Sequence, residues 1–266
     1  MFTSTQSKLA RHAHAVQQYI ASSQPRYAAL LDPASECHPI PCFGNPDSAL
    51  AVTVGLNPSA TEFTAARSWA GPLTSSALAD RCSGYFSRTA SNQSHPWFAP
   101  WSDGLASLGL SYEACSAVHL DLSPRATRSV SSLRTAGDRS LFLTMVQSDL
   151  WVFFATLQLC QAAKLVLLAG SVTGKYYLNE FLQRFAPAHS YSLDRPFTRR
   201  NHPGKGKTSW HWLSGPERRL PVFFCSSSPS DRPVTLLPQR IKENATTLKN
   251  LLNGAGPTAL PTSLSQ

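Results

Sequence analysis

Four short runs of mostly apolar residues mark the interior of this chain. Each lacks a clean alternation of apolar and polar positions, which is typical of strands buried on both faces of a parallel sheet. The runs are LAVTVGL (50–56), SAVHLDL (116–122), KLVLLAG (164–170) and LPVFFCS (220–226). Helical patterns cover 140–161, 174–185 and 236–252. This alternation predicts an α/β fold, a three-layer α/β/α sandwich with a central four-stranded parallel sheet.

A further helical pattern opens the chain over residues 7–22. Its apolar positions recur at the spacing of one helix face and are Leu9, Ala13, Val16 and Ile20. The pattern predicts an amphipathic helix packed on the domain. His12 and His14 lie on different faces of that helix, and we expect both to face solvent.

Composition bounds the class of protein. With 42% hydrophobic residues the chain can bury a core, which excludes wholesale disorder. The longest apolar run, residues 150–155, is far shorter than the ~20 residues that span a bilayer, and we find no export signal. Residues 253–266 are rich in Gly, Pro, Ser and Thr, as disordered tails are. We therefore predict one domain over residues 1–252, a disordered tail, a cytoplasmic location and no membrane partner.

Charge and cysteine content refine this picture. The 24 Lys and Arg against 15 Asp and Glu give a net charge of +9, which fits a polyanionic partner such as nucleic acid and equally fits a merely solvated basic surface. Cys37 and Cys42, with His38 between them, resemble half of a metal site. No second pair at ligand spacing accompanies them, so we interpret them as loop residues. We expect no metal and no cofactor.

Polar, turn-forming residues follow all four predicted strands. They are Asn57-Pro58-Ser59, Ser123-Pro124-Arg125, Gly170-Ser171 and the run SSSPS at 226–230. In open α/β sheets ligands bind outside the carboxyl ends of the strands. Pro and Ser also simply end strands, but four such loops at one edge predict a binding site there.

The segment TVGLNPS (53–59) resembles the first motif of the uracil-DNA glycosylase superfamily, in its Asn-bearing branches. Those branches carry a Gly-x-Asn-Pro-Gly core after the first buried strand. Ser228-Pro229-Ser230 is similar to the second motif, a His/Asn-Pro-Ser segment after the last strand, and residues 85–127 resemble a block of little-characterised members. The resemblance covers roughly residues 50–235 and implies a DNA glycosylase with the fold of that superfamily.

The resemblance assigns roles to the first motif. Asn57 would hold the attacking water near the sugar C1′, acting by position and electrostatics because an amide is a poor base. Gly55, Pro58 and Ser59 would form a tight turn against the substrate. Phe63 would stack on the flipped base, a role for which Tyr85 and Phe86 are the alternatives.

The strand 116–122 adds a candidate of its own. Asp121 is the acidic residue near the carboxyl end of this strand, and it could accept a hydrogen bond from an exocyclic amine or a sugar hydroxyl. The alternative is a capping or salt-bridged carboxylate.

Two positions depart from the superfamily pattern. Ser228 stands where a His commonly stabilises the leaving base, and Ser171 follows Gly170 where an Asn reads the base edge. Small hydroxylic residues leave room for a larger base, such as a hypermodified phage pyrimidine excised in anti-phage defence. The alternatives are a uracil or mismatch repair glycosylase, a catalytically weak DNA-binding protein, and a small-molecule hydrolase that uses Asp121 and the Ser-rich loop. The last lacks a GxSxG nucleophile elbow.

Cations between the last two strands suggest where DNA would lie. Residues 194–212 hold Arg199, Arg200 and Lys205 among aromatic residues, and we expect a loop laid along the DNA backbone. A solvated basic loop is the alternative. By the resemblance, Arg232 would fill the gap left by the flipped nucleotide, beside Pro229 and Ser230. We infer DNA as the partner and no obligate protein partner.

Overall fold

The structure of the protein is a computed structural model. It describes residues 4–31, 38–58, 73–87, 96–127, 135–172, 176–201, 206–227 and 236–254.

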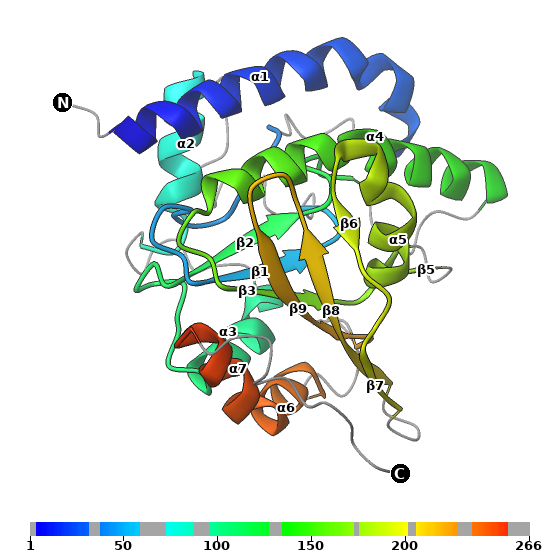
Figure 1. The fold of residues 1–266 in the computed structure, drawn as a ribbon. Helices are drawn as coiled ribbons and strands as arrows, with labels where there is room; N and C mark the ends of the chain where they lie inside the picture. The colour runs from blue at the N-terminus through cyan, green and yellow to red at the C-terminus, as the bar shows by residue number, and fades with distance from the viewer. Residues whose placement is uncertain are drawn as a thin grey trace.

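A mixed, mostly parallel sheet forms the centre of the molecule (Figure 1). Its strand order is β2-β1-β3-β9-β8-β6, and β7 also pairs with β8. The strands are β1 (Ala51–Gly55), β2 (Ala117–Asp121), β3 (Leu165–Ala169), β6 (Ser192–Leu193), β7 (Thr198–Asn201), β8 (Lys207–Ser214) and β9 (Arg219–Cys225). A separate antiparallel pair joins β4 (Ser171–Val172) to β5 (Tyr176–Tyr177).

The four strands predicted from the apolar runs are the four parallel ones. Every residue of β1, β2 and β3 is buried, because both faces of this part of the sheet are covered. Ala51 is in register with Ala117 on one side and with Leu165 on the other. The parallel part of the sheet is therefore confirmed.

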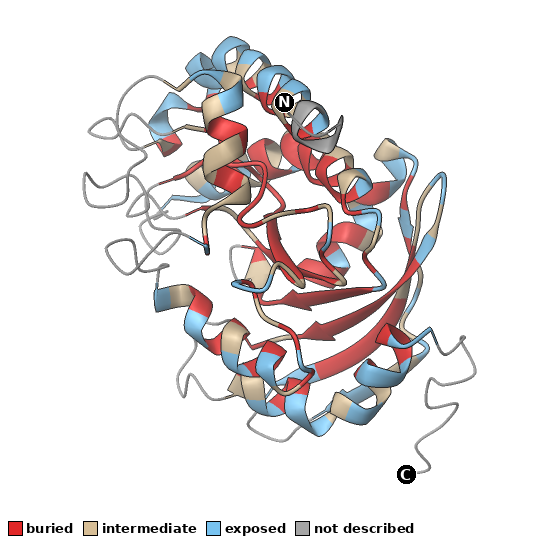
Figure 2. Ribbon diagram, turned by 90° about the vertical axis from the view of Figure 1, so that its left-hand side faces the viewer, coloured by how far each residue is buried: buried red, intermediate tan, exposed pale blue. Residues whose placement is uncertain are grey.

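Helices cover both faces of the sheet, as Figures 1 and 2 show. The longer helices α1 and α4 lie over one face, and α3, α6 and α7 lie over the other (Figure 1). The helices are α1 (Ser4–Tyr27), α2 (Ser75–Ser83), α3 (Ala99–Ala106), α4 (Ala136–Leu159), α5 (Leu178–Phe185), α6 (Leu236–Glu243) and α7 (Ala245–Leu252). Short 3-10 helices occur at Ala28–Leu30, Pro96–Phe98 and Ala186–His189. This arrangement is compatible with a three-layer α/β/α fold.

Two expectations need correction. The sheet does not stop at four strands, because β8 and β6 extend it in antiparallel fashion. The described part of residues 194–212, expected as a loop, instead forms most of a β-hairpin of β7 and β8. The aromatic residues explain the difference: Trp210 lies opposite Phe223 of β9, with 4.9 Å between ring centroids, so this segment packs as a strand.

The helix α4 is long and apolar because much of its surface packs in the core. It begins with a capping box between Thr135 and Asp138, and ten of its side chains are buried. Among the described residues it is the helix that could cross a bilayer by length and composition alone. The core helix of a soluble protein passes the same test, and over half of the apolar window of α4 is buried.

A buried ion pair ties the loop after β2 to the helices above it. The Arg125 Nε lies 3.0 Å from Oδ2 of Asp149 in α4, and both side chains are almost fully buried. Ser123 and Tyr19 donate further hydrogen bonds to the Asp149 carboxylate, at 2.6 Å and 2.9 Å. The guanidinium of Arg125 also bonds to Ser23 of α1. Because breaking such a pair typically costs about 3–5 kcal/mol, this network fixes the loop.

The N-terminal helix packs on the domain through the predicted apolar positions: Leu9, Ala13, Val16 and Ile20 are all buried, and the last two cluster with Val152 of α4. His12 does not face solvent as expected. Its Nε2 lies 2.8 Å from Oγ1 of Thr156, and its ring meets Trp151 edge-on. The Thr156 hydroxyl donates to the Val152 carbonyl, so Nε2–H of a neutral His12 is the donor.

Burial lowers the pKa of His12 to about 4, which predicts a pH-dependent stability. In the unfolded chain the imidazole takes up its proton near pH 6.5, whereas the folded protein resists protonation until about pH 4. The stabilisation is therefore present above pH 6.5 and is lost as the pH falls toward 4. We expect His12 to contribute a loss on the order of 1–2 kcal/mol between pH 7 and 5, measured by urea unfolding.

His12→Gln keeps an N–H donor for Thr156 without a titrating ring, so this part of the pH dependence should disappear. His14→Gln, at an exposed position of the same helix, is the matched control. An equally steep loss of stability in His12→Gln and in the wild type would contradict the assignment.

Candidate active site

The strand order places a topological switch point between β1 and β3. The chain adds β2 on one side of β1, whereas β3 and β9 lie on the other side. Ligands of doubly wound sheets bind outside the carboxyl ends of the strands at such a point. Asn57 follows β1, Asp121 ends β2 and Ser171 follows β3, so the topology brings these three predicted residues to one edge.

The side-chain amide of Asn57 is held in one orientation. Its Nδ2 donates to the carbonyl oxygens of Pro58 and Arg125, at 3.0 Å and 3.3 Å, and to Oγ1 of Thr127 at 2.9 Å. Carbonyl oxygens only accept, so the nitrogen must face them. Oδ1 of Asn57 is thereby presented as an acceptor, and Asn57 is only partly buried.

Asp121 lies against the backbone of β1, at a place that only a glycine leaves open. Gly55 is in register with Asp121, and a Cβ on Gly55 would come within 2.5 Å of the Asp121 Oδ1 and 2.9 Å of Nε2 of His119. His119 Nε2 and Asp121 Oδ1 are 3.3 Å apart. The glycine of the first motif is therefore required for packing a His–Asp pair.

This pair is one end of a buried chain of hydrogen bonds. The Thr53 hydroxyl lies 2.8 Å from Nδ1 of His119 and 2.6 Å from the hydroxyl of Tyr112. Burial raises the pKa of Tyr112 well above its usual value, so this phenol keeps its proton. All four side chains are buried, with exposed fractions from 0% for Thr53 to 7% for Asp121.

Aromatic rings surround His119. The nearest are Trp97 and Phe98, whose ring centroids lie 4.9 Å and 5.2 Å from that of the imidazole. Phe86 stacks on Tyr112 at 4.2 Å in the same cluster. Phe86 is thus a core residue next to the site, which argues against it as the platform for a flipped base.

On the other side of this sheet edge, Ser171 lies near one cation, Lys207. Ser171 pairs with Tyr177 across β4 and β5, and the ammonium of Lys207 lies 5.7 Å from the Tyr177 ring centroid. The backbone N–H of Lys207 donates to the Ser226 hydroxyl at 2.7 Å. The start of β8 therefore meets the carboxyl end of β9 at this edge.

The hairpin carries the predicted DNA-binding cations outward. Arg199 and Arg200 are exposed on β7, opposite Ser209 and Thr208 of β8. Figure 1 shows β7 and the start of β8 projecting from the body of the sheet. Nearby Phe197 is the exposed large hydrophobic residue of the described chain, at 41% exposure.

Several predicted residues lie outside the described part of the chain. They are Ser59, Phe63, Lys205, Ser228, Pro229, Ser230 and Arg232. Their roles stay predictions.

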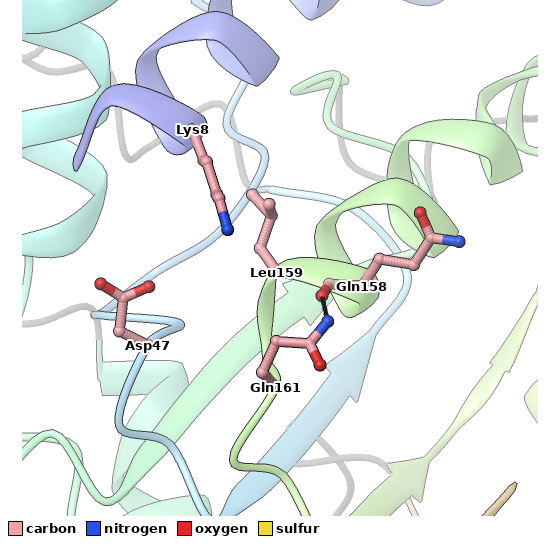
Figure 3. Close-up of a pocket in the computed structure, with 5 residues that line it drawn as sticks. All are labelled: Lys8, Asp47, Gln158, Leu159 and Gln161. Atoms are coloured by element: carbon pink, nitrogen blue, oxygen red, sulfur yellow. Dashed lines mark hydrogen bonds between the residues drawn. The ribbon is translucent and has the colours of Figure 1, made fainter. Parts of the chain in front are cut away.

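We searched the described residues for metal-binding clusters and for pockets. Within the ranges that the structure describes, no group of three His, Cys, Asp or Glu side chains could hold a metal ion. Figure 3 shows a pocket lined by Lys8, Asp47, Gln158, Leu159 and Gln161. Asp47 and Gln161 precede β1 and β3, so this pocket lies where the strands begin, at the edge opposite Asn57.

Comparison with known proteins assigns no family: no protein-family model matches the chain, and a search of curated proteins finds no relative.

Sequence reasoning missed His119, Thr53 and Tyr112. The sequence did contain one indication, the spacing of two residues that places both members of a pair on the same strand face. Thr53 and Gly55 have this spacing, and so do His119 and Asp121. The two pairs lie on the same face of the sheet because the parallel register places Thr53 beside His119, and this register cannot be read from the sequence.

Gly55→Ala should displace the Asp121 carboxylate. We expect a loss of about 1–3 kcal/mol in the free energy of unfolding, as for overpacked cores, measured in urea. Gly137→Ala is the control, because a Cβ there would meet only Thr135, at 3.6 Å. Stability equal to wild type in Gly55→Ala would show that the site tolerates the methyl group.

Proposed function

We propose that this protein is a monofunctional DNA glycosylase with the fold of the uracil-DNA glycosylase superfamily. It would hydrolyse the N-glycosidic bond of a damaged or modified base that has been flipped out of the stack. The observation that carries the proposal is the anchored amide of Asn57, at the carboxyl end of β1 and at the switch point of the sheet. The sequence resemblance at Gly55, Asn57 and Pro58 supports the same reaction.

The orientation of Asn57 suits the positioning of a water molecule. With its nitrogen bound to backbone carbonyls, Oδ1 accepts a hydrogen bond from a water and aims the lone pair of that water at C1′. No reorientation is needed when the substrate arrives, so the preorganised amide acts without being a base.

Binding to DNA is proposed to follow the projecting hairpin. Arg199 and Arg200 are exposed and stand near the carboxyl edge through the pairing of β7 with β8. Cations there neutralise phosphates, while an exposed aromatic such as Phe197 stacks on an unpaired base.

The substrate is proposed to be a base larger than uracil. Ser171 and Ser228 are smaller than the Asn and His that the resemblance leads us to expect, and a hypermodified phage pyrimidine in anti-phage defence would use the extra room. The departure at Ser228 also favours a second candidate, a catalytically weak DNA-binding protein. Losing one donor to a developing anion typically costs ~10²–10³ in rate.

Asn57→Ala should abolish base excision and leave DNA affinity within about threefold of wild type, because the amide positions water rather than DNA. The assay is alkaline cleavage at abasic sites in uracil-containing, mismatched and phage-modified DNA, with binding measured in parallel. We expect at least a ~10²-fold loss of rate, by analogy with oxyanion-hole amides. Asn253→Ala, at the exposed end of α7, is the control.

Excision at the wild-type rate by Asn57→Ala would remove this residue from the mechanism. Abasic sites formed by neither protein on any of these DNAs would favour the DNA-binding candidate.

The hairpin cations should govern the salt dependence of DNA binding. Replacing Arg199, Arg200 and Lys205 with Ala should lower the slope of log K against log[salt] by up to ~0.9 per lost phosphate contact on duplex DNA. Replacing Lys242 and Lys249, exposed cations on α6 and α7, should change the slope less. An unchanged slope in the hairpin variant would place DNA elsewhere.

A further inference from the structure

Asp121 and Asp149 are both buried carboxylates, but their surroundings differ. Asp149 is paired with Arg125 and accepts hydrogen bonds from Ser123 and Tyr19. Asp121 accepts one bond, from His119, and no other side chain within the described residues bonds to its carboxylate. Among the described residues the Asp121 carboxylate thus has fewer partners than that of Asp149, so a structural role explains Asp149 better than it explains Asp121.

The proton positions around His119 make Asp121 an acceptor. The Thr53 hydroxyl lies 2.6 Å from the Tyr112 hydroxyl, 2.8 Å from Nδ1 of His119 and 3.3 Å from the Val118 carbonyl, so it joins the tyrosine to the imidazole. A carboxylate oxygen only accepts, so Nε2–H of His119 is the donor to Oδ1 of Asp121. The chain of side chains from Tyr112 to His119 thus holds the Asp121 carboxylate in place.

Backbone pairing brings Asp121 beside Asn57. The N–H groups of Leu122 and Ser123 donate to the carbonyls of Gly55 and Leu56, so the chain after β2 runs alongside the chain that leads to Asn57. Asn57 in turn is bound to Arg125 and Thr127 of that same segment. The anion and the amide therefore come from adjacent segments at one edge of the sheet.

We propose that Asp121 is a catalytic residue that faces the sugar and that His119 is its positioning residue, an inference that rests on the proposed glycosylase function. As the C1′–N bond breaks, its electron pair leaves with the base, and positive charge develops on C1′ and the ring oxygen. The Asp121 carboxylate stabilises this charge. The water held by Asn57 then bonds to C1′ through oxygen, and its proton passes to Asp121, which returns it to solvent or to the departing base.

The test needs no knowledge of the excised base. It compares binding to DNA with one cationic pyrrolidine abasic analogue against DNA with one neutral tetrahydrofuran analogue. Wild type should prefer the pyrrolidine by on the order of tenfold or more, as expected for a charged hydrogen bond. Asp121→Asn keeps the shape and should bind both equally, whereas Asp103→Asn, exposed on α3, should keep the preference.

Variants of His119 test the positioning role. His119→Leu removes the donor and should reduce the pyrrolidine preference, while retained affinity for tetrahydrofuran DNA reports a folded site. His119→Gln offers an amide N–H to Asp121 and should restore part of the preference. A preference that is the same in His119→Leu as in wild type would overturn the role of His119.

The two proposals fail differently. If wild type binds both analogues better than intact DNA but shows no pyrrolidine preference, or keeps one in Asp121→Asn, the role of Asp121 is wrong and the glycosylase proposal stands. If neither analogue is preferred over intact DNA, both proposals are overturned.

Discussion

The ion pair between Arg125 and Asp149 is the interaction on which the site depends. Two charges taken out of water must satisfy each other, and here Ser123 and Tyr19 complete the set around Asp149. The pair joins α4 and α1 to the loop after β2. In that loop the backbone carbonyl of Arg125 accepts a hydrogen bond from the side-chain amide of Asn57. Burial raises the pKa of Asp149, while Arg125 and the hydroxyl groups oppose the rise. The buried ion pair therefore fixes the loop whose carbonyl group orients the Asn57 amide.

The parallel register adds a second constraint. Because Thr53 lies opposite His119 and Gly55 opposite Asp121, a chain of polar side chains runs through the interior toward the strand ends. Only a residue without a side chain at position 55 leaves room for the carboxylate. The glycine next to Asn57 thus serves the neighbouring strand as well as its own turn.

Sequence reasoning located the elements whose residues are buried on both sides, since a continuous apolar run such as LVLLA in β3 is typical of a strand covered on both faces. It failed for β8, where Ser209 and His211 interrupt the aromatic residues although both are buried and 2.7 Å apart. The place of Asn57 at the end of β1 could be predicted, but the orientation of its amide could not, because that orientation depends on a carbonyl group 68 residues away along the chain. The chain of hydrogen bonds from Tyr112 to Asp121 could not be predicted either, because it depends on how β1 and β2 are aligned, and no local sequence pattern gives that alignment.

The position of β7 at the outside of the sheet has a consequence for the behaviour of the protein in solution. Within the described residues β7 pairs only with β8, and a strand exposed on its other side can add a strand from another molecule. The guanidinium groups of Arg199 and Arg200 oppose that addition, because two copies would bring like charges together. Salt screens this repulsion over a Debye length of about 10 Å at 0.1 M. The charges of Arg199 and Arg200 therefore keep copies of the protein apart, and high salt favours self-association through this edge.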